Sequence, residues 1–446
     1  MIKQIIIVYE NIVREYDNAL LLKAEFERRG FQVYLAYKTE TILFIKRSSI
    51  ILVPNCYNTD NYDFYQYTLN SNGNPIISLQ YEQVLSKRIE KTGMHNPKGK
   101  AKNIYFFCWG KNCFDRLCKY GIEEKRIKIC GALQLDFLRP EFSGFYLTRK
   151  ELADQYKLDC EKKWLLYISS FSYVDNSIIT KYTAEELADD IFIKDFTELS
   201  VRSQEKTLNW FEQLIIENPD ITIIYRKHPV EAGNRRIEEL TKQYPFNFKN
   251  IDDLSVKQWV SVCDIIVTWF STSIAEVYMA KKPLLLLRPY PIKEEYDVPF
   301  YYRADCIDSY EKLGYAINNI EQFSIPVSIE ILNGYYSLKE KPAFLRIADE
   351  VEKIASAYTK QQKIDVKFVL YRLRFFLKKG RLIKFILKSI YQTLFIHFNF
   401  KLRNERIRNA YCVNDWEKSA KHKNDTLNKE KYQILKEIVN EYRKSI

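Results

Sequence analysis

The residues best suited to chemistry follow an apolar run at residues 221–226, where the sequence continues Arg226-Lys227-His228-Pro229. Such a run predicts a buried strand, and Pro229 marks its end because proline cannot donate to a sheet. Two fixed cations and an imidazole at a strand end would suit an anionic phosphate group. The alternative is an ordinary strand end whose polar side chains face water.

A second turn rich in hydroxyl groups follows the predicted strand at residues 264–269. Its polar residues are Ser271, Thr272, Ser273 and Glu276. A helix begins here, and its free N–H groups and dipole favour an anion. Ser273 and Glu276 also have the spacing of a capping box, which needs no ligand. We predict that this turn neighbours the strand leading to His228, and two adjacent turns of this kind favour a phosphate site.

A third turn, Ser169-Ser170-Phe171-Ser172, follows the predicted strand at residues 164–168. Small hydroxyl residues can leave backbone amides open to a ligand, but they are equally common as turn formers. Ser170 is therefore a candidate donor contact, and both interpretations stay open.

Two carboxylates in the first third of the chain are candidates for a general base. Glu15 lies just after the predicted strand at residues 2–9, and Glu82 follows the one at residues 75–79. A base that deprotonates an acceptor hydroxyl must approach from the side opposite the donor, which fits either acid. Asp17, at the start of a helix, is better explained as a cap.

These positions belong to a regular alternation of short apolar runs with helical patterns. Further strands are predicted at residues 31–37, 50–54, 104–109, 126–130 and 283–287. Doubly buried strands that alternate with helices predict parallel sheets, so we expect an α/β protein with two tandem Rossmann-like domains. We place them at residues 1–150 and 151–358, with a helix at 342–358 closing the second domain. Ligands bind such sheets at the carboxyl ends of their strands.

The segment at residues 360–410 carries fourteen Lys or Arg against two acids, and its net charge of +12 equals that of the whole chain. Its apolar residues fall on one helical face, at Val369, Leu373, Phe376, Ile383, Leu387, Ile390 and Leu394. The longest stretch without a charged residue, 389–400, is shorter than the roughly 20 residues needed to span a bilayer. We expect the extension at 359–446 to lie on an anionic membrane surface. Helices that pack on the protein or on a second subunit are the alternative, and nucleic-acid binding is disfavoured by the large apolar face.

Targeting and redox signals point to the cytoplasm. The sequence MIKQIIIVYE has the pattern of a first strand and lacks that of a signal peptide. Nine scattered cysteines without a zinc-type spacing favour buried thiols in a reducing compartment.

Four stretches resemble the GT-B transferases of bacterial surface polysaccharide assembly, a group with surface-carbohydrate biosynthesis proteins, Kdo transferases and CDP-glycerol glycerophosphotransferases. They are ENIVREYDNALLLKAEFERRG (10–30), the segment 109–138, RKHP (226–229) and DIIVTWFSTSIAEVYMAKKP (264–283). The resemblance implies a nucleotide-activated donor on the second domain and an acceptor on the first. It assigns donor phosphate contacts to His228, Ser271, Thr272 and Ser273, and places Glu276 near the donor sugar or ribose. No metal ion or further cofactor is expected, because cations and helix amides neutralise the leaving phosphate.

Two departures from the family pattern matter. Polyol-phosphate transferases of this group have a His-Gly pair after the fourth strand, whereas this chain has Gln80-Tyr81-Glu82. A Gly-Asn-Pro-Arg-like stretch is replaced by Gly131-Ala132-Leu133-Gln134. The sequence thus favours a peripheral glycosyltransferase on the inner face of the cell membrane that extends a lipid-linked polymer such as a capsule. A polyol-phosphate transferase of teichoic-type polymers, a nucleotide-sugar epimerase and a non-catalytic scaffold remain alternatives.

Overall fold

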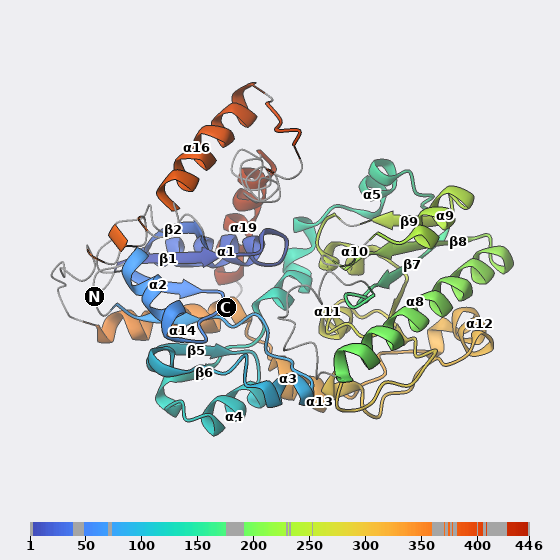
Figure 1. Cartoon of the computed structure of the whole chain (residues 1–446), viewed down its shortest axis with the longest axis horizontal. Coiled ribbons are helices and arrows are strands. Elements are labelled where there is room, and N and C mark those ends of the chain that lie inside the picture. Colours follow the sequence, from blue (N-terminus) through green and yellow to red (C-terminus); the bar gives the residue numbers. More distant parts are fainter. Residues whose placement is uncertain are drawn as a thin grey trace.

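The computed structural model describes most of the chain in two sheet-containing halves (Figure 1). The described residues are 3–38, 49–69, 74–174, 191–228, 231, 233–251, 253–358, 370, 373–374, 377, 381–398, 400–404, 407 and 426–444. Pro229 and much of the basic segment at 360–380 lie outside them.

The first half holds a six-stranded parallel sheet with the order β2-β1-β3-β4-β5-β6. Its strands are β1 (Gln4–Tyr9), β2 (Gln32–Tyr37), β3 (Ser49–Val53), β4 (Ile76–Ser78), β5 (Tyr105–Cys108) and β6 (Ile127–Ile129). Its helices are α1 (Ile12–Arg28), α2 (Thr59–Leu69), α3 (Lys87–Thr92) and α4 (Lys111–Lys119). The central strands are buried on both faces, so their sequences read as continuous apolar runs rather than as alternating ones.

The second half holds a five-stranded parallel sheet with the order β11-β10-β7-β8-β9. Its strands are β7 (Lys163–Ile168), β8 (Ile221–Arg226), β9 (Phe248–Ile251), β10 (Ile265–Thr268) and β11 (Leu284–Leu286). Its helices include α5 (Arg149–Tyr156), α8 (Ile191–Glu217), α9 (Arg235–Gln243), α10 (Val256–Val262), α11 (Ile274–Met279), α12 (Tyr310–Asn318) and α13 (Ile329–Tyr336). The predicted α/β class with two tandem Rossmann-like sheets is confirmed. Strand β9 was not predicted, because the polar residues in the middle of its sequence, FKNI, conceal its apolar ends.

Two expectations about neighbours need correction. Helix α14 (Ala343–Ala357), predicted to close the second domain, packs against α1 in the first half, where Arg29 pairs with Asp349 and Glu352, each at 2.9 Å. The turn after β10 does not directly neighbour the turn after β8, because β7 lies between these two strands. The chain therefore crosses back to its first half after completing the second, as the orange α14 in Figure 1 shows.

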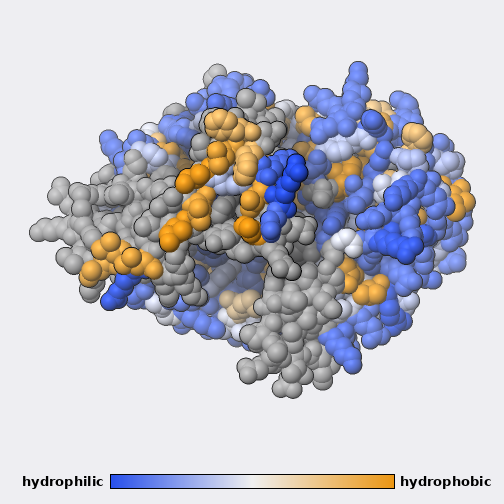
Figure 2. Space-filling view, turned by 45° about the horizontal axis from the view of Figure 1, so that its top comes forward, coloured by the Kyte–Doolittle hydropathy of each residue, from blue (hydrophilic) through white to orange (hydrophobic). Residues whose placement is uncertain are grey.

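The C-terminal part contains two long helices with different surroundings. Helix α19 (Thr426–Lys444) packs on α1 and buries Leu435, Ile438 and Val439 in the core of the first half. Helix α16 (Arg381–Phe398) buries Tyr391 and Phe395, whereas its four predicted apolar-face residues are exposed, namely Ile383, Leu387, Ile390 and Leu394. Of the other predicted residues of this face, Leu373 is also exposed, and Val369 and Phe376 lie outside the described residues. Figure 2 shows hydrophobic, orange side chains gathered on the face of the molecule to which α16 belongs in Figure 1. Within the described chain, none of the helices combines the length and apolarity that crossing a membrane requires.

Candidate active site between the two sheets

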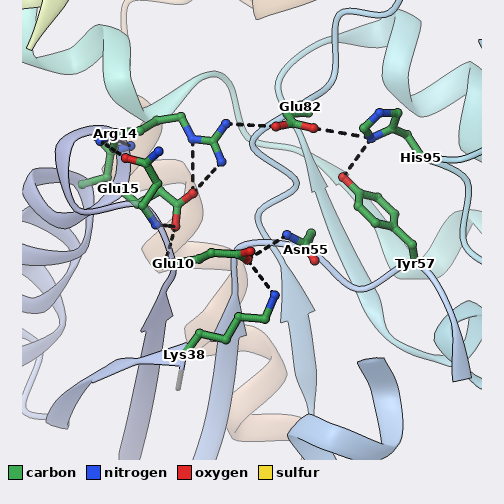
Figure 3. Close-up of polar contacts among 10 residues, drawn as sticks. Glu10, Arg14, Glu15, Lys38, Asn55, Tyr57, Glu82 and His95 are labelled. Atoms are coloured by element: carbon green, nitrogen blue, oxygen red, sulfur yellow. Dashed lines mark hydrogen bonds and ion pairs between the residues drawn. The ribbon is translucent and has the colours of Figure 1, made fainter. Parts of the chain in front are cut away.

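A chain of polar contacts crosses the strand ends of the first sheet (Figure 3). Arg14 Nη2 donates to Glu15 Oε1 at 2.7 Å, and Arg14 Nη1 donates to Glu82 Oε1 at 3.1 Å. His95 Nδ1 lies 3.7 Å from Glu82 Oε2 and 3.4 Å from the Tyr57 hydroxyl. The structure therefore brings together both carboxylates predicted from the sequence and adds an imidazole and a phenol.

The two carboxylates have different surroundings. Glu15 is 1% exposed, and its Oε2 accepts backbone N–H groups from Glu10 at 2.8 Å and Asn11 at 3.2 Å. These contacts occupy the Glu15 carboxylate and hold the turn between β1 and α1. The side chain of Glu82 is 52% exposed, so its carboxylate is open to a substrate.

His95 was missed in the sequence because it does not follow a predicted strand, and Tyr57 was missed although it follows the predicted strand at residues 50–54. His95 is in the loop between α3 and the short 3-10 helix at Gly99–Asn103, and its carbonyl accepts from Gln80 Nε2 at 3.3 Å. Burial lowers the pKa of His95, while Glu82 opposes that effect. The available signal for His95 in the sequence was that histidine is rare, since the chain has only four His.

The three predicted donor turns begin side by side on neighbouring strands. In the sheet register, Ile168 at the end of β7 pairs with Thr268 of β10 on one side and with Arg226 of β8 on the other. The turns that carry Ser170, Ser271 and His228 therefore leave the same edge of the sheet.

A buried glutamate that the sequence did not suggest organises the turns after β7 and β8. Glu231 is 4% exposed and accepts from Ser169 Oγ at 2.6 Å, Tyr225 Oη at 2.7 Å and the backbone N–H of His228 at 3.0 Å. Burial raises the pKa of Glu231, and these donors oppose the rise. Glu231 thus fixes the backbone at which the His228 side chain begins.

The cations of this turn differ in their environment. Arg226 is buried and donates from Nη2 to the carbonyl of Leu254 at 2.8 Å, whereas Lys227 is half-buried. Burial, together with the charge of Arg226, lowers the pKa of His228 to about 4. At neutral pH its imidazole is therefore uncharged and can donate one hydrogen bond and accept another.

The turn after β10 is held by its own side chains. The N–H of Ser271 donates to Thr268 Oγ1 at 3.2 Å, and the N–H of Ser273 donates to Ser271 Oγ at 3.1 Å. Ser273 is the N-cap of α11, but its side chain makes no capping hydrogen bond, so the capping box suggested by the sequence does not form. In the turn after β7, Ser170 buries an Oγ atom that has no partner in the described part of the chain.

The two sheets meet at this edge through aromatic and charged residues. The ring of Tyr336 stacks on Trp109, which follows β5, at 5.7 Å, and its hydroxyl donates to the carbonyl of Thr272 at 2.8 Å. Glu276 is buried, and burial raises its pKa to about 7 although Lys257 opposes the rise. The described residues include no cluster of His, Cys, Asp and Glu suited to a metal ion.

Three solved structures are similar to this chain at low sequence identity. The wall teichoic acid polymerase TagF matches with a TM-score of 0.52 and 12% identity over 81% of this chain and 91% of that chain. The MnaA protein of S. aureus, solved with UDP, matches with a TM-score of 0.49 and 14% identity over 81% and 100%. The UDP-GlcNAc 2-epimerase of Neisseria meningitidis matches with a TM-score of 0.49 and 12% identity over 78% of this chain and 100% of that chain.

At 12% sequence identity, the similarity to TagF shows a shared fold. The chain is therefore a two-domain α/β protein of the GT-B type, as the sequence resemblance implied. The sequence matches no family model and no curated protein.

Proposed function

We propose that the protein is a GT-B glycosyltransferase that moves a sugar from a nucleotide donor to a lipid-linked acceptor of a cell-surface polysaccharide. The observation that carries the proposal is the pairing of two chemically different strand edges. The second sheet presents cations, hydroxyls and a neutral imidazole, whereas the first presents an exposed carboxylate beside an imidazole.

On the donor side, Arg226, Lys227 and His228 bind the diphosphate, together with the turns of Ser170 and Ser271–Ser273. The positive charges of Arg226 and Lys227, with the N–H groups of His228 and of the turns, stabilise the negative charge that develops as the bond from sugar to phosphate breaks. Glu276 contacts the donor sugar or ribose. The leaving group is the nucleoside diphosphate, and this arrangement works without a metal ion.

On the acceptor side, Glu82 and His95 form the base. The acceptor hydroxyl loses its proton to His95, or to Glu82 directly, while its oxygen bonds to the anomeric carbon of the sugar. Glu15 is a positioning residue in this scheme, because it holds Arg14 against Glu82.

The acceptor would reach this edge from a membrane. The exposed strip of α16 (Ile383, Leu387, Ile390 and Leu394), in a segment with a net charge of +12, suits the surface of an anionic leaflet on the cytoplasmic side. We therefore propose peripheral membrane association through this helix.

The deciding experiment is thermal unfolding with CMP, CDP, UDP, GDP and dTDP. A ligand at a hundred times its Kd stabilises a protein by about 2.7 kcal/mol. One nucleotide should raise the melting temperature of the wild type and of His95→Ala, but not that of His228→Ala. His95→Ala is the matched control, because it removes an imidazole from the acceptor side.

The alternatives give different outcomes. Release of a free epimer in the absence of acceptor would establish an epimerase, and transfer from CDP-glycerol would establish a polyol-phosphate transferase. Absence of any nucleotide effect would contradict the proposal and favour a scaffold.

A further inference from the structure

A buried arginine behind the acceptor edge lacks a partner for most of its guanidinium group. Arg116, on α4, is 6% exposed. Its Nη2 donates to Cys113 Sγ at 3.5 Å, whereas Nε and Nη1 are buried without a hydrogen-bond partner in the described part of the chain. Three of its five N–H groups therefore have no acceptor.

This arrangement is unfavourable unless something else binds there. A guanidinium group stays protonated in proteins, and a buried charge is normally paired with an opposite charge and hydrogen-bonded. The Cys113 sulfur, protonated or not, satisfies only the Nη2 side. An acceptor oxygen of an anionic ligand would complete the set.

The position of Arg116 connects it to the acceptor edge. Cys113 Sγ lies 3.9 Å from Gln80 Oε1, and the Gln80 amide in turn donates to the carbonyl of His95 at 3.3 Å. Burial lowers the pKa of His95 most, and the charge of Arg116 lowers it further against the effect of Glu82. Arg116 thus lies within electrostatic reach of the imidazole. Ser78, at the end of β4, also buries a hydroxyl that has no partner among the described residues.

We propose that Arg116 is an anion-binding residue that receives a phosphate or carboxylate group of the acceptor next to His95. The proposal names a chemical feature of the acceptor and in that respect rests on the proposed function. Its ligand is defined by shared chemistry, since both groups offer the charged oxygen atoms that a guanidinium group prefers.

The test uses the full chain without nucleotide and compares inorganic phosphate, pyrophosphate and acetate at constant ionic strength. At a hundredfold excess over its Kd, an anion should raise the wild-type melting temperature by about 3 °C, because the unfolding entropy of a 446-residue chain is large. The part of this shift that the donor turns do not supply should be lost in Arg116→Met and reduced in Arg116→Lys, whereas it should persist in His228→Ala. Phosphate or pyrophosphate as the active anion would indicate a phosphate ligand, and acetate a carboxylate.

A second measurement distinguishes a loss of anion binding in Arg116→Met from a folding defect. Without its ligand, an unpaired buried cation destabilises the protein, so Arg116→Met should melt at the wild-type temperature or above it. The control is Arg288→Met, because Arg288 is equally buried but pairs with Asp297 at 2.8 Å and should melt lower when replaced. Three results would each overturn the proposal. One is a fall in the melting temperature of Arg116→Met as large as that of Arg288→Met. The others are an equal anion-induced shift in the wild type and Arg116→Met, and the absence of any anion-induced shift in the wild type. Nucleotide-induced stabilisation should persist in Arg116→Met, which separates this test from that of the donor site.

Discussion

The Nδ1 atom of His95 lies 3.7 Å from Oε2 of Glu82, and the other oxygen of that carboxylate accepts from Arg14 at 3.1 Å. Glu82 is therefore shared between a permanent cation from α1 and an imidazole from a loop. A carboxylate in this position raises the proton affinity of the imidazole, because it stabilises the protonated form.

Replacement of Glu82 by Gln should lower the transfer rate by about 10²–10⁴-fold, the usual contribution of a general base. Nucleotide binding should not change. Because Glu82 opposes the lowered pKa of His95, the acid limb of the pH–rate profile should move to lower pH in the variant. Glu124→Gln, at an exposed position, is the control. A fully active Glu82→Gln enzyme with an unmoved profile would exclude Glu82 from proton transfer.

Glu276→Gln should change how stability depends on pH. Burial raises the pKa of Glu276 from 4.5 to about 7, so the folded state binds the proton more tightly than the unfolded state. The wild type should therefore lose stability as the pH rises from about 4.5 to 7, by on the order of 2–3 kcal/mol from this group.

The variant should avoid that loss, so it should be more stable than wild type at pH 8 and no more stable at pH 4.5. Urea unfolding at the two values measures the difference, and Glu205→Gln on the exposed face of α8 serves as the control. Equal effects at both pH values would show that Glu276 is ionised in the folded protein.

Ion pairs between the two halves should contribute weakly and in a salt-dependent way. Lys91 of α3 pairs with Glu295 at 3.0 Å, next to the pair of Lys87 with Glu294 at 2.8 Å. Exposed pairs contribute about 0.2–1 kcal/mol. Lys91→Glu should lose this amount of unfolding free energy, and addition of Glu295→Lys should restore it at low salt but not near 1 M, where screening is strong. A double variant no more stable than Lys91→Glu at low salt would contradict a direct interaction between Lys91 and Glu295.

Substitution of two leucines in the C-terminal helices should change the unfolding free energy by very different amounts. Leu435 of α19 is fully buried, so Leu435→Ala should destabilise the protein by about 2–5 kcal/mol. Leu387 of α16 is 43% exposed, and Leu387→Ala should be nearly neutral. Denaturant unfolding of the two variants provides the comparison, and similar losses would mean that α16 is packed on the protein.

Membrane binding should depend on the exposed side of α16. Leu387→Glu with Ile390→Glu should abolish co-sedimentation with vesicles that contain anionic lipid, because charges on an inserted face are costly. Thermal stability should not change, since both side chains are exposed. Unaltered sedimentation of the double variant would exclude α16 as the anchor. Removal of everything after Tyr358 is a poorer test, because it also removes α19 from the core.

The candidate site was partly predictable because its donor turns follow apolar strands that can be read from sequence alone. Arg226, Ser271 and Ser170 were found by position at strand ends, and the register places their turns side by side. His95 was not found, because it reaches the site from a loop whose place depends on packing. The burial of Arg116 was not foreseen either, because it depends on how α4 packs. Glu231 was missed for the same reason.

The sequence by itself determined every strand except β9, the parallel α/β class, the basic segment and the amphipathic pattern of α16, because these depend on the composition and periodicity of neighbouring residues. The tertiary structure decided that α14 and α19 pack on the first half, that β7 separates β8 from β10, and that Glu82 meets both Arg14 and His95. Contacts of this kind join residues far apart in the chain. They depend on which apolar faces pack against each other, and no local sequence pattern specifies that pairing.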